Sequence, residues 1–186
     1  MTPDYDAVAR ARQGDESAYA ELLSRYRDRV FTFLLRVAGD PTDAEDLAQE
    51  TFLKAFTSFD LYDASRPLIS WLFKIAHNTA YDHLRARRIA VSLDDEEGVL
   101  ELADDAAGPE ESASASFNSE LIERAFAALP PAYREVMLLR HKEELEYSQI
   151  AEITGLPEGT VKIRLFRGRD LLKGKLEALG LAPETK

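Results

Sequence analysis

Apolar residues recur every three or four positions along most of this chain, which is the spacing of amphipathic helices, and no segment alternates as a strand does. In the first part of the sequence we expect three or four helices, of which three can be bounded: 16–38, 41–58 and 66–88. Gly39 ends the first of these, because glycine readily adopts the left-handed backbone that closes a helix. Asp40 and Pro41 begin the second, as N-cap and first helical residue.

The second part of the sequence predicts four more helices, over residues 119–129, 131–143, 147–154 and 158–179. Pro130 stops the first of them, since proline cannot continue a helix. A turn that contains Gly155 separates the last two, so that a short helix, a turn and a longer helix follow one another. This is the order of a helix-turn-helix. The whole pattern predicts an all-α protein.

The distribution of charge divides these helices into two groups. The chain has 186 residues and a formal net charge of −11. Nearly all of this charge lies in residues 89–120, which hold ten acidic residues and no basic one and are rich in alanine and serine. Such a segment buries too little apolar surface to fold alone. We therefore expect two small helical domains, 1–88 and 118–186, joined by a flexible acidic linker at 89–117.

The residue inventory argues against catalysis. The sequence has no cysteine, which excludes disulfides, thiolate chemistry and cysteine-ligated zinc. His77, His83 and His141 have no carboxylate or nucleophile in a credible arrangement, and no glycine-rich phosphate loop occurs. We expect no enzyme activity, no cofactor and no metal. Because there is no apolar run of about 18 residues and no secretory signal at the start, we also expect no membrane insertion and a cytoplasmic location.

The helix at 158–179 gathers basic residues in an otherwise acidic chain. When the side chains are projected around the helix axis at about 100° per residue, one apolar stripe appears. We expect this stripe to be buried, and it consists of Val161, Leu165, Gly168 and Leu172. The opposite face carries Lys162, Ile163, Phe166 and Arg167, with Arg164 and Arg169 on the same helix. Cations beside exposed apolar groups suit the major groove of DNA, where they meet phosphates, guanine edges and thymine methyls. The alternative is a solvated helix of an ordinary bundle, which rarely needs isoleucine and phenylalanine at the centre of its outer face.

The helix at 66–88 has a polar face of a different kind. Its expected buried stripe consists of Leu68, Leu72, Ile75, Ala76 and Thr79. The opposite face carries Lys74, His77, Asn78, Tyr81, Arg85 and Arg88. Bases of single-stranded nucleic acid can stack on a ring, an amide can bond a base edge, and cations can follow the phosphates. The alternative is an ordinary polar helix face, with Trp71 in the core or at its boundary.

The helix at 41–58 has an acidic outer face. We expect its buried side to consist of Ala44, Ala48, Thr51, Phe52 and Ala55, and its outer side to carry Asp46, Gln49, Glu50 and Leu53. Such a face repels DNA, whereas a leucine in its middle suits contact with a protein. The alternative is a plain solvated surface.

Three stretches carry a family resemblance: DAEDLAQETFLKAF, RPLISWLFKIAHNTAYDHLRARR and ALPPAYREVMLLRHKEELEYSQIAEITGLPEGTVKIRLFRGRDLL. They occur in this order, with the acidic segment between the second and the third. Over about residues 5–178 the chain resembles the extracytoplasmic-function (ECF) sigma factors, members of the sigma-70 family of bacterial RNA polymerase. The resemblance implies a promoter-specificity subunit that binds core RNA polymerase, reads the −10 and −35 promoter elements and promotes strand opening.

The resemblance also implies a role for each face. The outer residues of helix 41–58, which are Asp46, Gln49, Glu50 and Leu53, would bind the polymerase's largest subunit. The face with Lys74, His77, Asn78, Tyr81, Arg85 and Arg88 would bind the single-stranded −10 element, and Asn78 would read an unpaired base. On the duplex −35 element, Lys162, Ile163, Phe166 and Arg167 would contact bases, and Arg164 or Arg169 phosphates. The acidic linker would run towards the RNA path, and an anti-sigma factor is an implied partner.

The sequence departs from the family pattern at two positions of the last helix. Ile163 replaces a small hydroxyl residue, so the −35 sequence cannot be transferred from relatives. Gly168 replaces the commoner alanine, which predicts a looser helix centre. Two other functions fit parts of the sequence. A polymerase-independent helix-turn-helix transcriptional regulator would dimerise and bind duplex operators alone, and a helical adaptor protein would bind no DNA.

Overall fold

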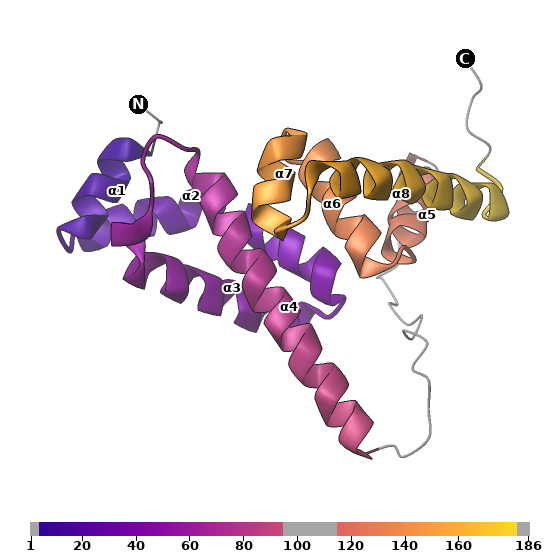
Figure 1. Cartoon of the computed structure of the whole chain (residues 1–186), viewed down its shortest axis with the longest axis horizontal. Coiled ribbons are helices and arrows are strands. Elements are labelled where there is room, and N and C mark those ends of the chain that lie inside the picture. Colours follow the sequence, from indigo (N-terminus) through magenta and orange to yellow (C-terminus); the bar gives the residue numbers. More distant parts are fainter. Residues whose placement is uncertain (1–3, 95–114, 182–186) are drawn as a thin grey trace. The chain divides into compact units, whose positions relative to one another are not determined.

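The computed structural model describes residues 4–94 and 115–181, and all regular structure within them is helical (Figure 1). The predicted all-α class is therefore confirmed. The first group of elements is α1 (Tyr5–Arg12), α2 (Glu16–Ala38), α3 (Pro41–Thr57), the 3₁₀ helix η1 (Phe59–Leu61) and α4 (Leu68–Asp94). The second group is α5 (Ala115–Ala127), α6 (Pro131–His141), α7 (Tyr147–Thr154) and α8 (Glu158–Ala178).

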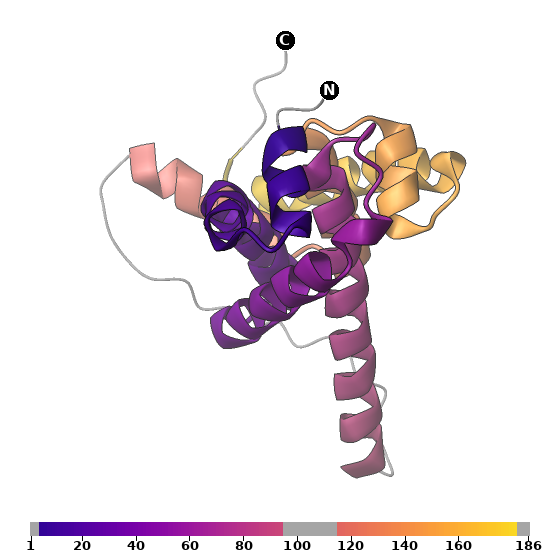
Figure 2. The same ribbon diagram turned by 90° about the vertical axis from the view of Figure 1, so that its left-hand side faces the viewer.

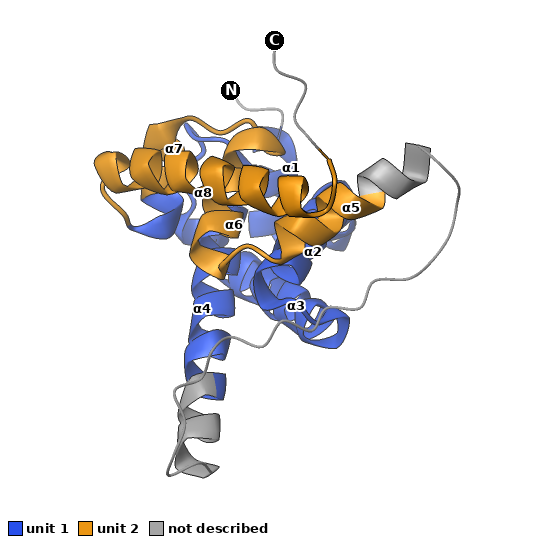
Figure 3. Ribbon diagram, turned by 90° about the vertical axis from the view of Figure 1, so that its right-hand side faces the viewer, with its two compact units in different colours: residues 1–98, 152–155 blue, residues 99–151, 156–186 orange. Residues whose placement is uncertain are grey.

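The chain divides into two compact units, residues 1–98 with 152–155 and residues 99–151 with 156–186 (Figure 3). Most of the segment interpreted as a linker lies outside the described residues, so the linker and the domain limits at 88 and 118 stay predictions. The helices beside it are longer than expected, because α4 continues to Asp94 and α5 already begins at Ala115. The expected limits rested on composition alone, and residues 89–97 contain no glycine or proline that would stop a helix.

The junction between α2 and α3 follows from local sequence, as predicted. Gly39 has a φ of 83°, and its amide donates to the carbonyl of Leu35. The Asp40 carboxylate accepts from the backbone amides of Thr42 and Asp43, at 2.8 and 2.9 Å, and Pro41 is the first helical residue. These contacts satisfy donors at the start of α3 that have no partner within the helix.

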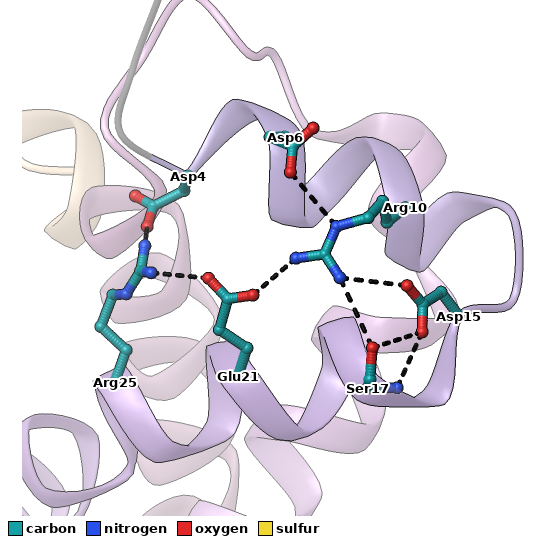
Figure 4. A network of polar contacts seen from close by, with 7 residues as sticks. All are labelled: Asp4, Asp6, Arg10, Asp15, Ser17, Glu21 and Arg25. Atoms are coloured by element: carbon teal, nitrogen blue, oxygen red, sulfur yellow. Dashed lines mark hydrogen bonds and ion pairs between the residues drawn. The ribbon is translucent and has the colours of Figure 1, made fainter.

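Helix α1, which the sequence pattern did not bound, has only eight residues and needs tertiary contacts to be stable. A network of side-chain contacts holds it on α2 (Figure 4). At its centre the Arg10 guanidinium donates to carboxylates of Asp6, Asp15 and Glu21, at 3.2, 3.0 and 2.6 Å. Arg25 of α2 continues the network to Glu21 and to the buried Asp4. Burial, followed by the hydrogen bond to Asp4, raises the pKa of the Tyr26 hydroxyl.

Arg12, at the end of α1, fixes the segment that precedes α4. Its guanidinium donates to the carbonyl of Phe59, at 2.6 and 2.9 Å, and to that of Tyr62, at 2.7 Å. The rings of these two residues lie 5.8 and 5.3 Å from the Trp71 ring, measured between centroids. Trp71 is therefore a boundary residue of the core, as expected from the sequence, and the start of α4 is anchored.

Helix α4 packs against both α2 and α3, and its C-terminal half extends past them (Figures 1 and 2). As predicted, Leu68, Leu72, Ala76 and Thr79 are buried, but Ile75 is only half-buried. The prediction also missed three buried residues, Ile69, Phe73 and Ala80. Because α2 and α3 both pack on α4, they bury a wider part of its surface than one neighbouring helix would. A single apolar stripe therefore underestimates the buried side of α4.

In the second unit, α8 packs against α6 through Gly168. A Cβ placed on this glycine would lie 2.7 Å from Sδ of Met137, which is closer than two such atoms approach. The expectation that Gly168 merely loosens the helix is therefore incomplete, because its missing side chain makes room for Met137. Leu172, expected to be buried, is half-buried.

The two glycines of α8 outside its first turn give a matched test of this packing. A Cβ added to Gly174 would have no neighbouring atom within 4 Å, so Gly174→Ala is expected to raise the free energy of unfolding by about 0.5–1 kcal/mol. Gly168→Ala gains the same helix propensity but displaces Met137, and is expected to lower that free energy by up to about 2 kcal/mol. Urea unfolding of the full chain, followed by circular dichroism, measures both. Equal stabilisation by the two substitutions would contradict this account.

Candidate nucleic-acid interface

The predicted reading face of α8 is exposed, and its opposite side is buried. Val161 and Leu165 are fully covered, whereas Ile163 and Phe166 have exposed fractions of 54% and 64%. Lys162 and Arg167 are exposed beside them. Two large apolar side chains at the centre of a basic, solvent-facing surface are unfavourable in water, but they are suited to base edges and thymine methyls.

The two remaining arginines of α8 differ in their surroundings. Arg164 is half-buried and Arg169 is exposed. Burial first, and then the positive charges of Arg169 and Arg140, lower the pKa of His141 below its usual value. His141 therefore adds no full positive charge to this surface near neutral pH, and the positive charge of the region rests on its arginines and lysines.

The turn that precedes α8 is built as a helix-turn-helix requires. Gly155, at the end of α7, has a φ of 68°, in the left-handed region that glycine tolerates best. At the start of α7 the side-chain oxygen of Gln149 accepts from the backbone amide of Glu146 at 2.8 Å. Ile150 and Ile153 of α7 are buried. The short helix is thus fixed at both ends.

Tyr147 and Arg140 belong to this site, although the sequence analysis did not identify them. Lys162 Nζ lies 5.4 Å from the centroid of the Tyr147 ring, and Cζ of Arg140 lies 5.0 Å from it. Lys162 also lies 3.8 Å from the Glu158 carboxylate. The sequence shows that Tyr147 is an aromatic residue at the start of the short helix. Its contact with Lys162 is a tertiary contact, which becomes visible only in the folded structure.

The predicted face of α4 is present from Lys74 to Arg85. Lys74, Asn78 and Arg85 are exposed, and the half-buried rings of His77 and Tyr81 lie 4.4 Å apart at 39°. Arg88 lies beyond the described side chains. An exposed carboxamide beside a pair of rings and two cations is a surface on which an unstacked base could lie.

Helix α4 is also tied to α3 by polar contacts. Lys54 Nζ donates to the Thr79 hydroxyl at 3.2 Å, and Arg87 lies 3.5 Å from Asp43. His83 Nε2 lies 3.2 Å from the Asp43 carboxylate without hydrogen-bond geometry. Asp43 was not identified from the sequence as a neighbour of His83. Asp43 lies in another helix, so the spacing along the sequence could not reveal it.

The predicted protein-binding face of α3 is fully solvent-facing. Asp46, Gln49 and Glu50 are exposed, and Leu53 has an exposed fraction of 66%. Glu50 pairs with Lys54 at 2.7 Å. All five residues expected on the buried side of this helix are buried: Ala44, Ala48, Thr51, Phe52 and Ala55.

None of the helices within residues 4–94 and 115–181 has the length and apolar character of a membrane span. Within the same ranges no group of three or more histidine or acidic side chains is arranged to hold a metal ion.

Two exposed basic faces of different chemistry, one of them on a helix-turn-helix, define an all-helical DNA-binding protein with a separate acidic surface. Comparison with protein families narrows this class. Residues 22–89 match the family model of sigma-70 region 2, and residues 119–172 match that of sigma-70 region 4. The region 2 match includes the outer face of α3 and the polar face of α4 as far as Arg88. The region 4 match includes the exposed basic face of α8.

Relatives that align with this chain over nearly their whole length are also sigma factors. The chain is 33% identical to the ECF RNA polymerase sigma factor SigW of Bacillus subtilis, over 92% of this chain and 96% of that protein. It is 32% identical to the ECF RNA polymerase sigma-E factor of Haemophilus influenzae, over 95% of this chain and 96% of that protein. The chain belongs to the ECF sigma factors, the promoter-specificity subunits that were predicted from the sequence.

Solved structures support the same assignment. The sigma factor RpoE of Bartonella quintana, in complex with the anti-sigma factor NepR, superposes with a TM-score of 0.71 at 26% identity, over 86% of this chain and 96% of that one. CnrH, in complex with the cytosolic domain of CnrY, gives a TM-score of 0.65 at 25% identity, over 94% of this chain and 97% of that one.

Proposed function

We propose that this chain binds core RNA polymerase, reads a two-part promoter with α4 and α8, and promotes opening of the DNA strands. The observation that carries the proposal is the pair of exposed nucleic-acid faces, one in each sigma-70 region, with different side chains. The α4 face offers rings and a carboxamide to an unpaired base, and the α8 face offers cations and apolar groups to a major groove. A protein that only bound duplex operators would have no use for the first.

At the −35 element, α8 would enter the major groove. Lys162, Ile163, Phe166 and Arg167 would contact bases, and Arg164 or Arg169 phosphates. At the −10 element the α4 face, which consists of Lys74, His77, Asn78, Tyr81, Arg85 and Arg88, would hold the separated strand. Capture of an unpaired base would favour the open state, so strand opening needs no chemistry on this chain. The phosphodiester bond would be made by the polymerase, and we propose that the chain itself is not an enzyme.

The acidic segment at 89–117 would suppress binding to DNA by the free chain. Phosphate contacts drive non-specific binding, and the nine carboxylates of this segment oppose them. Once polymerase holds the two readers, each raises the effective concentration of the other, so two weak affinities combine. The expected site of action is the cytoplasm.

This account can be tested by comparing DNA binding by the chain alone with binding by the chain on core polymerase. We expect the free chain to bind duplex DNA weakly, without sequence preference and with strong salt dependence, and the complex to select a two-part sequence. Tight, sequence-specific binding by a dimer of the free chain would instead favour the operator-binding regulator.

The α3 face is proposed to dock on polymerase through Asp46, Gln49, Glu50 and Leu53. Leu53→Asp is expected to weaken binding to core polymerase by about thirty-fold or more, because an apolar side chain at the centre of an interface would be replaced by a charge. Leu53→Met keeps the apolar contact and should bind normally. Competition against a labelled wild-type chain measures both affinities. Equal binding by the two variants would remove α3 from the interface.

An anti-sigma factor is a further proposed partner. Both solved structures described above are complexes with a second protein, which is named an anti-sigma factor in the Bartonella complex. The exposed apolar residues of α3 and α8 give such a partner surfaces to cover, which would block polymerase and promoter binding together.

A further inference from the structure

Two cations of the second unit lie over the ring of one tyrosine. The centroid of the Tyr147 ring is 5.0 Å from Cζ of Arg140 and 5.4 Å from Nζ of Lys162. Both distances are within the range of a cation–π attraction. Helices α6, α7 and α8 thus contribute one side chain each to a cluster that ends at the reading face of α8.

The Arg140 end of this cluster is fixed. The guanidinium donates to the carbonyl of Leu145 at 2.8 Å and to the Glu146 carboxylate at 3.3 Å, and the Arg140 side chain is only 29% exposed. The carbonyl of Leu139 also accepts from the amide of Leu145 at 3.0 Å. The backbone that carries Tyr147 is therefore held in place before any DNA is bound.

The Lys162 end, in contrast, is solvent-facing and flexible by nature. Its side chain is 56% exposed and has a four-carbon stem with many rotamers. Glu158, one turn earlier and itself half exposed, lies 3.8 Å away, and an exposed ion pair of this kind restrains a lysine weakly. The tyrosine ring, attached to a fixed backbone, is a second restraint on where the ammonium lies.

We propose that Tyr147 is a positioning residue for −35 recognition, whose ring holds the Lys162 ammonium at the DNA-reading face. The inference rests on the proposed function, because it takes Lys162 as a base contact. Holding the side chain in a productive position reduces the conformational entropy lost when DNA binds. It also limits which base pairs the ammonium can reach, and so it acts on specificity.

Substitutions at Tyr147 separate the ring from the hydroxyl. Tyr147→Leu keeps an apolar side chain but removes the π face, and Tyr147→Phe keeps the π face but removes the hydroxyl. With holoenzyme and a duplex library randomised in the −35 region, Tyr147→Leu is expected to lower affinity for the preferred sequence about two- to five-fold. It should also flatten the base preference at the positions that Lys162→Met flattens. Tyr147→Phe should retain both properties.

The double variant Tyr147→Leu/Lys162→Met completes the test. If the tyrosine acts through the lysine, adding Tyr147→Leu to Lys162→Met should cause little further loss. A full additional loss would overturn the proposal, since Tyr147 would then act independently. An equal loss of affinity in Tyr147→Phe and Tyr147→Leu would also overturn it, because the effect would then belong to the hydroxyl. The same holds if Lys162→Met leaves the base preference in the −35 region unchanged. If the proposed function itself is wrong, wild-type holoenzyme will show no −35 preference at all.

Discussion

Holoenzyme carrying Asn78→Ala is expected to lose about ten- to a hundredfold of its promoter-specific transcription. Asn78 is an exposed carboxamide on α4, beside the paired rings of His77 and Tyr81. An amide that bonds a base edge contributes roughly 1–3 kcal/mol of discrimination, and alanine can supply no such bond. The open complex would lose the contact that favours it. Permanganate reactivity of unpaired thymines, measured with transcript yield, follows the opening step directly.

A matched control separates this effect from general damage to the first unit. Gln13→Ala removes another exposed carboxamide of the same unit, at the end of α1, and should leave opening unchanged. Asn78→Ala should still bind core polymerase with wild-type affinity and should recover part of its activity on a template whose strands are already separated. Normal opening of duplex promoters by Asn78→Ala would show that α4 does not read the base through this residue.

Arg167→Ala is expected to reduce the affinity of holoenzyme for its −35 element by about ten- to a hundredfold and to relax selection at one base pair. Arg167 is exposed on α8 beside Phe166, and an arginine that bonds a guanine edge in two places supplies roughly 1–3 kcal/mol. Filter binding to duplexes with single substitutions in the −35 region measures both the affinity and the selection.

Lys173→Ala gives the control for charge alone. Lys173 is also exposed on α8, but it lies about a third of a turn away from the Arg167 direction and pairs with Glu177 at 3.8 Å. Its removal should weaken binding slightly and equally for all sequences. If Arg167→Ala behaves in the same uniform way, Arg167 contacts phosphate and the base-reading role assigned to it is wrong.

Much of the fold could be predicted because the signals that set it are local. Gly39, Asp40 and Pro41 define the end of one helix and the start of the next by backbone preference alone, and the structure has the boundary where they indicate it. The exposed sides of α3 and α8 were likewise predictable, since each of these helices buries one stripe and leaves the opposite face in water.

The remaining features depend on contacts between helices that are distant in the sequence. Phe73 is buried because α4 has two neighbours, and its ring lies 5.1 Å from that of Phe33 of α2. Gly168 leaves space that the Met137 side chain occupies, and Tyr147 meets Lys162 across the turn of the helix-turn-helix. A projection of one helix cannot contain such information, because it represents a single element without its surroundings.

In-vitro transcription shows whether this chain gives core polymerase its choice of promoter. Core bacterial polymerase would be incubated with fragmented genomic DNA from the source organism, with and without this chain, and the RNA 5′ ends would be mapped. We expect discrete start sites that appear only with the chain and share a two-part upstream motif. The absence of such starts, together with a shift of duplex DNA by the chain alone, would contradict it.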